Sequence, residues 1–263
     1  MINPKPKQND ENIEKIIEIE IEALKKIRLR ADELIGVCTY CITTKAKILS
    51  QVISHIYLFQ IKMLEEFLNL IELKHYYSAN LVAGILFENY IYLSWILLDE
   101  QDKRAELYWD YAKIYTILEP NVSKETLKNI KKFIKDDRLD PLALSSYNET
   151  WHIDNYKGKK IIVSIKSMCK RIGERYKKAG GTDISERLQR SYGIYCSFKH
   201  CEPMAVINHN WGSNENTIQK QSATQLAYIS LLSSLKITYT YFHPKDDMDC
   251  KDFDIFEKIK KLI

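Results

Sequence analysis

The side chains best suited to chemistry in this chain lie between Tyr192 and His200. If this stretch is helical, Tyr192, Cys196 and His200 fall at i, i+4 and i+8 on one face. Ser197 lies beside His200 on the same side. A hydroxyl, a thiol and an imidazole on one stripe could serve in proton transfer or nucleophilic attack. The same stripe could be a polar seam in a helical core, and the sequence leaves both interpretations open.

Glu88 is a second candidate, because it stands in the most apolar stretch of the chain. Its neighbours at helical intervals of four are Asn80, Gly84 and Tyr92. An ionised carboxylate in a core needs a partner or a raised pKa. We therefore expect Glu88 either to pair with a Lys, Arg or Tyr or to face a cleft toward His200. The candidate catalytic group consists of Glu88, Tyr192, Ser197 and His200.

Metal and cofactor chemistry find little support in the sequence. Cys196, His200 and Cys201 are ligand types that zinc accepts, but adjacent residues on a helix rarely face one ion. Cys38 and Cys41 form a CxxC pair with no second pair at zinc-ribbon spacing. The phosphate-binding, dinucleotide-binding and HExxH patterns are also missing. We predict no metal site and no cofactor, and the sequence leaves open whether the protein is an enzyme.

Basic residues are concentrated in one segment. Between Lys157 and Lys178 there are nine Lys or Arg residues against Glu174 alone, with Tyr156 and Tyr176 interleaved. Such a segment could follow a phosphate backbone, or it could be the solvated face of a helix in a lysine-rich protein. The residues predicted to bind phosphate or nucleic acid are Lys159, Lys160, Lys170 and Arg171.

The composition favours a soluble helical protein. In 263 residues, 45% are hydrophobic and 28% charged, which is ordinary for a globular chain. Only 8 Gly and 6 Pro are present, and this scarcity favours long helices with few connections. The net charge of +4 is mildly basic. Six cysteines without a signal-peptide pattern predict reduced thiols and a cytoplasmic protein.

Apolar residues at three- and four-residue spacing predict helices along most of the chain. These helices span about residues 10–37, 43–73, 76–98, 103–118, 123–135, 161–178, 183–199 and 217–242, with a turn or short helix over 140–149. Residues 152–160 and 206–216 are predicted to be loops. The apolar run 81–98 has the length of a membrane span, but Glu88 and Asn89 at its middle favour a buried core helix. No membrane span is expected.

The predicted fold class is all-α, a multi-helix bundle with a long N-terminal helical arm. Residues 1–37 would form the arm, 38–250 the helical bundle domain, and 251–263 a basic C-terminal tail. The amphipathic arm could pack against a second copy and make a homodimer, or it could lie on its own domain.

The order of landmarks in the chain resembles a bacterial all-α family known only as a domain of unknown function. These landmarks are Glu88 and Trp95, Arg104, Trp151, Gly158-Lys159, Arg171, and finally Tyr192, Ser197 and His200. The resemblance implies a helical, bacterial, cytosolic protein and no established reaction. A more remote similarity is to the helical nucleotide-binding domains of toxin and phage-defence systems. Ribonucleases of that kind have an Arg four to six residues before a His, and none of the six histidines here has one.

Two functions are therefore expected, in order of preference. The first is binding of a protein or a nucleic acid, in a stress or phage-defence setting. The alternative is a nuclease or other phosphoester hydrolase, in which His200 is the acid or base and Glu88 orients it. In that alternative Lys159 and Lys160 hold the phosphate.

Overall fold

Long helices dominate the part of the chain that the structure describes, as the apolar spacing predicts. The computed structural model describes residues 8–115, 153–156, 159–162, 164–199 and 213–243. The helices are α1 (Gln8–Thr43), α2 (Ile48–Glu72), α3 (Tyr76–Leu98), α4 (Gln101–Tyr115), α6 (Ile165–Lys178), α7 (Ser185–Lys199) and α9 (Ser213–Phe242). The predicted all-α, multi-helix bundle is confirmed.

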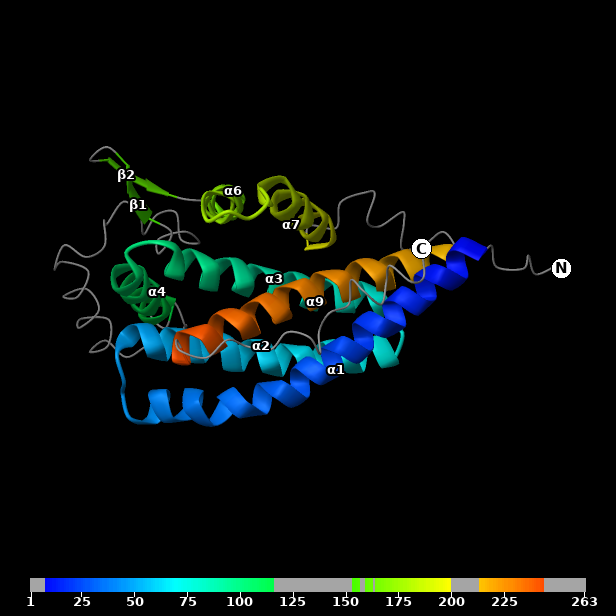
Figure 1. Ribbon diagram of the computed structural model, residues 1–263, viewed down its shortest axis with the longest axis horizontal. Helices are drawn as coiled ribbons and strands as arrows, with labels where there is room; N and C mark the ends of the chain where they lie inside the picture. The colour runs from blue at the N-terminus through cyan, green and yellow to red at the C-terminus, as the bar shows by residue number, and fades with distance from the viewer. Residues whose placement is uncertain (1–7, 116–152, 157–158, 163, 200–212, 244–263) are drawn as a thin grey trace.

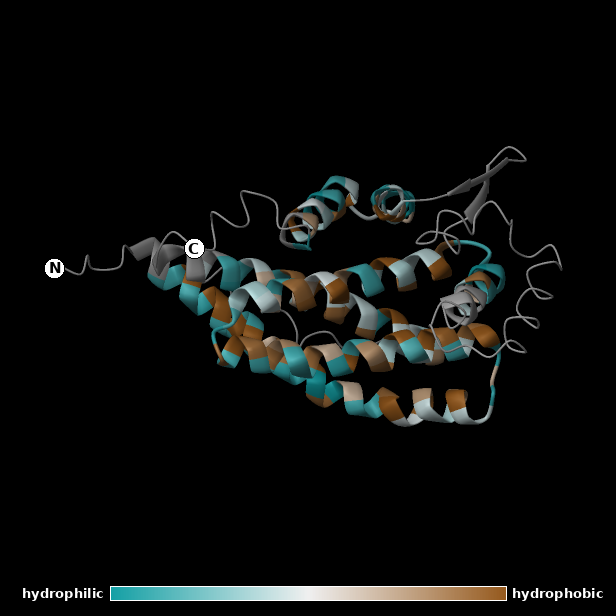
Figure 2. Ribbon diagram, turned by 180° about the vertical axis from the view of Figure 1, so that it is seen from behind, coloured by the Kyte–Doolittle hydropathy of each residue, from teal (hydrophilic) through white to brown (hydrophobic). Residues whose placement is uncertain are grey.

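Four long helices form the body of the molecule, and two shorter helices cover one side of it (Figure 1). Helices α1, α2, α3 and α9 pack lengthwise against one another. Helices α6 and α7 pack on each other and on α3, forming a layer outside the four long helices. The residues of α6 are mainly hydrophilic in Figure 2, because much of this short helix faces solvent.

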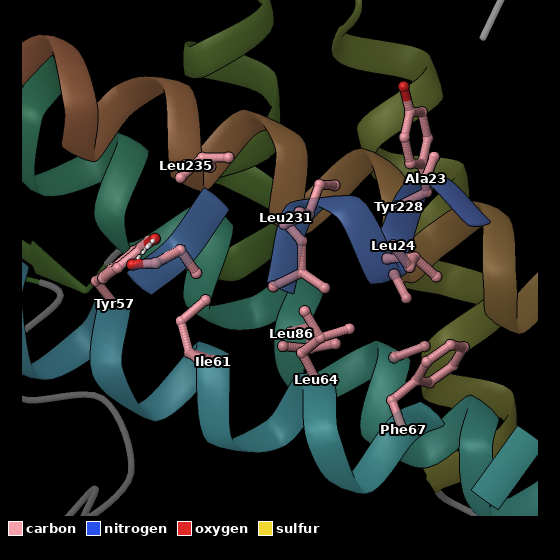
Figure 3. Close-up of a cluster of buried hydrophobic side chains, with 14 of the residues drawn as sticks. Ala23, Leu24, Tyr57, Ile61, Leu64, Phe67, Leu86, Tyr228, Leu231 and Leu235 are labelled. Atoms are coloured by element: carbon pink, nitrogen blue, oxygen red, sulfur yellow. Dashed lines mark hydrogen bonds between the residues drawn. The ribbon is translucent and has the colours of Figure 1, made fainter. Parts of the chain in front are cut away.

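Two clusters of buried side chains hold these helices together. The first lies between α1, α2, α3 and α9 and includes Leu24, Leu64, Phe67, Leu86 and Leu231 (Figure 3). The second lies between the ends of α2, α3 and α4 and the inner face of the α6–α7 layer. Its fully buried members include Ile53, Trp95, Ala105, Met168 and Cys169. The layer is thus fixed to the bundle by apolar packing.

The N-terminal helix packs along its own bundle. Its apolar stripe is fully buried against α2 and α9, with Ile17, Leu24 and Ile27 each 0% exposed. Helix α1 also continues past the predicted arm boundary, because Cys38 and Cys41 extend the buried stripe by another turn. Of the two arrangements left open by the sequence, the structure has the helix lying on its own domain. The division into 1–37, 38–250 and 251–263 stays a prediction.

The structure differs from the predicted loops at two places. Strands β1 (Ile153–Tyr156) and β2 (Lys159–Ile162) pair antiparallel, with Ile153 opposite Ile162, where a loop over 152–160 was expected. In the sequence, segments that contain isoleucine flank the two residues Lys157-Gly158, a pattern that favours such a hairpin. Helix α9 begins at Ser213, four residues before the predicted start. The predicted helices over 123–135 and 140–149 lie outside the described residues.

Helix α3 is the most apolar element. Among the described helices it alone is long and apolar enough, by length and composition, to cross a membrane. A core helix of a soluble protein has the same properties. In the bundle, α3 packs against α2, α4, α6, α7 and α9, as the predicted core helix would.

A buried carboxylate lies where α1 meets α9. Glu20 is 2% exposed, and its Oε2 lies 3.0 Å from the hydroxyl of Thr224. The hydroxyl donates toward this carboxyl, and it also lies 2.9 Å from the carbonyl oxygen of Lys220, a second acceptor. Burial raises the pKa of Glu20 from 4.5 to about 7, although the Thr224 hydrogen bond opposes this rise.

Replacing Glu20 by Gln should stabilise the protein above pH 7 by about 2–3 kcal/mol, and by progressively less toward pH 5. The folded wild type keeps a proton on Glu20 between pH 4.5 and about 7, whereas the unfolded chain has lost it. The free energy of unfolding of the wild type therefore falls as pH rises through this range and levels off above it. Urea unfolding at several pH values measures the difference.

The exposed Glu18 on the same helix provides the control, because Glu18→Gln should leave the pH dependence unchanged. If Glu20→Gln raises the free energy of unfolding by the same amount at every pH, the assignment of a raised pKa to Glu20 is wrong.

Candidate functional site

Helix α7 meets α3 at a glycine. Tyr195 is 4% exposed, and its ring occupies the space where any larger residue at position 84 would place its Cβ. A Cβ on Gly84 would lie only 1.7 Å from Cδ2 of Tyr195 and 1.9 Å from its Cε2. Real Cβ atoms do not approach other atoms this closely, so the contact requires Gly at this position.

Glu88 lies one helical turn beyond Gly84 and has a cation as a partner. Its Oε1 is 3.4 Å from the Nζ of Lys199, near the C-terminal end of α7. The Glu88 side chain is 15% exposed, and that of Lys199 is 47% exposed. The ammonium of Lys199 also lies 5.5 Å from the centre of the Tyr195 ring, within range of a cation–π interaction. The expectation that Glu88 would need a polar partner is met by Lys199.

Three tyrosines surround this ion pair. Burial raises the pKa of Tyr92, Tyr192 and Tyr195 above the ordinary value of a phenol, and the nearby charge of Glu88 raises each further. For Tyr192, the hydrogen bond with Cys196 also contributes to the higher pKa. The phenols therefore stay protonated. The cluster combines a carboxylate, an ammonium and phenolic groups that can donate hydrogen bonds.

The structure brings together part of the predicted catalytic group. Glu88 and Tyr192 lie on the contacting helices α3 and α7, close enough for the charge of Glu88 to raise the pKa of Tyr192. Ser197 lies on α7, but its side chain is outside what the structure describes. His200 lies outside the described residues. A contact between Glu88 and His200 therefore stays a prediction.

The predicted phosphate-binding residues have different surroundings. Lys170 is exposed on α6, with its Nζ 3.9 Å from Glu174 Oε1. Arg171 is half-buried, and its guanidinium lies 5.6 Å from the centre of the Trp95 ring. Lys159 and Lys160 are the first two residues of β2, and the structure describes only their backbone.

The arginine cluster around Trp95 was missed as a structural unit. The guanidinium carbon of Arg104 lies 3.7 Å from the centre of the Trp95 ring, and its Nη1 donates to the Trp95 carbonyl at 2.6 Å. Trp95 belongs to the last turn of α3, where four carbonyls have no partner within the helix. The buried Arg104 thus caps α3 and offsets the negative end of its dipole. The sequence showed Trp95, Arg104 and Arg171 only as scattered landmarks.

Metal binding has no candidate group in the described part of the chain. No three His, Cys, Asp or Glu residues come together there in a way that could hold an ion. The CxxC thiols Cys38 and Cys41 are both buried and free. Burial raises the pKa of Cys38 to about 11, which disfavours the thiolate that a metal requires.

A comparison with family models decides where the chain belongs. Residues 50–218 match the model of DUF5677, a family of unknown function. The chain belongs to this family. The matched region extends from α2 into α9, so it contains the Glu88–Lys199 pair and the Trp95 cluster of this DUF5677 protein. No curated protein and no solved structure matches the chain.

Replacing Gly84 by Ala should destabilise the DUF5677 protein by about 1–3 kcal/mol, because the added methyl overlaps the Tyr195 ring. Combining Gly84→Ala with Tyr195→Ala should cost less than the sum of the two single changes, since removal of the ring makes room for the methyl. Thermal or urea unfolding of the four proteins gives this coupling energy.

Gly36 provides a matched control on α1. A Cβ there would meet nothing within 4 Å, so Gly36→Ala should be neutral or stabilising. If the losses of unfolding free energy in the two single variants add up to the loss in the double variant, the overlap with the Tyr195 ring is not what destabilises Gly84→Ala.

Proposed function

We propose that this DUF5677 protein is a binding module that holds the phosphate backbone of a nucleic acid on the outer face of α6 and α7. The observation that carries the proposal is the concentration of positive charge in this layer. Residues 164–199 contain nine basic and three acidic residues, a net charge of +6. The whole chain has a net charge of +4, so the remaining residues together carry −2. A layer of one sign on an otherwise near-neutral protein attracts a polyanion.

The basic side chains of the layer are available to a ligand. Besides Lys199, which pairs with Glu88, the exposed ones are Lys166, Lys170, Arg175, Lys177, Lys178, Arg187 and Arg190. Two of them have acidic neighbours within the layer, at 3.9 Å for Lys170 and Glu174 and 3.8 Å for Lys177 and Asp183. Exposed ion pairs of this length contribute little free energy, so a phosphate can replace the carboxylate.

The layer is also held rigidly enough to present these charges in a fixed pattern. The side chain of Ser164 caps α6 by accepting a hydrogen bond from the backbone N–H of Ser167 at 3.2 Å. The inner face of α6 is buried in the second cluster through Met168 and Cys169. Gly173 allows the backbone of Ser185 to approach so closely that a Cβ on Gly173 would lie 2.3 Å from its nitrogen. The positions of the charges on α6 and α7 are therefore set before a ligand arrives.

The setting we propose is the one that the sequence predicts, a bacterial cytoplasm with a role in stress or phage defence. The free thiols of Cys38, Cys41, Cys169 and Cys196 support a reducing compartment. A homodimer through α1 also remains a proposal. Because the apolar stripe of α1 is buried in its own bundle, such a contact would have to use exposed residues such as Leu29 and Tyr40.

Charge reversal on α6 tests the binding proposal. Lys166→Glu combined with Lys170→Glu should weaken oligonucleotide binding at least about tenfold at low salt, because two phosphate contacts become repulsive. The dependence of log K on log salt should also become less steep by about one unit or more. Fluorescence anisotropy at several salt concentrations measures both quantities.

Lys25→Glu combined with Lys62→Glu is the matched control, since it makes the same change in net charge at exposed positions of α1 and α2. Equal losses in the two double variants would overturn the proposed site. Wild-type binding that does not depend on salt would overturn the proposal itself.

The same oligonucleotides test the hydrolase alternative. The Glu88–Lys199 pair favours this alternative, because Lys199 directly precedes His200 in the sequence. If the wild type cleaves the oligonucleotide and the Glu88→Gln variant does not, the protein is a phosphoester hydrolase and the binding proposal is wrong.

A further inference from the structure

The C-terminal turn of α6 holds an aromatic ring at the surface. The N–H of Gly181 donates to the carbonyl of Tyr176 at 3.1 Å, and the N–H of Gly180 donates to that of Lys177 at 3.0 Å. Gly180 has φ +91°, the left-handed conformation that ends many helices. This pair of hydrogen bonds is the Schellman motif, which fixes the last turn of the helix and folds the following residues back on it.

The ring of Tyr176 lies against the backbone of Gly181. A Cβ on Gly181 would lie 2.3 Å from Cε1 of Tyr176 and 2.5 Å from its Cδ1, so only glycine leaves room for the ring. Tyr176 is nevertheless 54% exposed. The contact with Gly181 therefore orients the ring and leaves a large part of it open to solvent.

Three cations share the C-terminal turn of α6 with Tyr176. Arg175, Lys177 and Lys178 are its neighbours in sequence, and all three are exposed. Lys177 lies 3.8 Å from Asp183, whereas Arg175 and Lys178 have no ion-pair partner among the described residues. The C-terminal turn of α6 thus presents an oriented aromatic ring and carries three exposed cations.

We infer that Tyr176 is a stacking platform for an unpaired base, and that the ligand of the α6–α7 layer is a single-stranded nucleic acid. This inference rests on the proposed function. Proteins that bind single strands combine cations along the backbone with aromatic rings on which bases stack. In a duplex each base is stacked between its neighbours, and its faces cannot reach an exposed ring. An oriented ring adds binding energy because little of its freedom is lost when a base stacks on it.

The ring could also serve only to close the turn, since an apolar contact between these two positions often accompanies the Schellman motif. The two roles separate by substitution. Leucine at position 176 keeps an apolar side chain over Gly181 but has no aromatic face. Phenylalanine keeps the face and loses only the hydroxyl.

Binding of oligothymidylate and oligouridylate, compared with a hairpin duplex of equal charge, tests the inference. Tyr176→Ala and Tyr176→Leu should weaken binding of the single strands by about 5- to 100-fold and that of the duplex by less than about twofold. Tyr176→Phe should bind like the wild type. The two single strands distinguish DNA from RNA as the source of the unpaired bases. Tyr40→Ala, which removes another exposed tyrosine from α1, should change none of these affinities.

The outcomes separate this inference from the proposed function. If the Tyr176 variants weaken single strands and duplex equally, or weaken neither, while charge reversal on α6 still matters, then the stacking role is wrong and the basic site stands. If the wild type binds neither kind of nucleic acid in a salt-dependent way, both are wrong.

Discussion

Helix α3 has apolar residues around most of its circumference, so water has to be kept from nearly all of its surface. Its buried residues include Ala79, Leu86, Phe87, Ile91 and Ile96. A single neighbour can cover only one side of a helix, and α3 accordingly packs against α2, α4, α6, α7 and α9. The α6–α7 layer lies where it does because it covers the side of α3 that the other long helices leave open (Figure 1).

Several polar residues of α3 make contacts that join it to neighbouring elements. Asn80 donates from its side-chain nitrogen to the carbonyl of Gln219 on α9 at 3.0 Å. Glu88 pairs with Lys199 on α7. One turn earlier, the absence of a side chain at Gly84 makes room for the ring of Tyr195 on α7. At the end of the helix, Arg104 reaches back to the carbonyl of Trp95. Asn80, Glu88 and the Trp95 carbonyl thus join α3 to α9, α7 and α4.

Charge and burial divide the molecule into two parts with different roles. The four long helices bury most of the apolar surface and contain more acidic than basic residues, one of which, Glu14 of α1, pairs with Lys220 of α9 at 3.0 Å. The α6–α7 layer buries one narrow face and exposes its cations. Because the layer is fixed by the core beneath it, its outer residues are free to serve binding.

Much of this architecture could be predicted from local spacing, because a helical stripe of apolar residues is a property of neighbours in sequence. The bounds of α3 were correct at both ends. Helix α1 was predicted too short, because the apolar stripe was followed only to residue 37, whereas the buried Cys38 and Cys41 continue it.

The contacts that complete the site could not be predicted, because they join residues distant in sequence. Lys199 has the i+7 spacing from Tyr192 that places it on the same face of α7, but nothing local selects it over His200 as the partner of Glu88. Similarly, nothing in the sequence around Gly84 indicates that the ring of Tyr195, 111 residues later, packs against it. Arg104 belongs to the helix after Trp95, so no periodicity links the two.

The central claim is that the outer face of α6 and α7 holds a nucleic acid. Lysine acetylation read by mass spectrometry, with and without oligothymidylate, tests it residue by residue. The account predicts that the nucleic acid protects Lys166, Lys170 and Lys178 and leaves Lys25 and Lys62 as reactive as before. Equal protection of both groups, or protection confined to the lysines of α1 and α2, would contradict it.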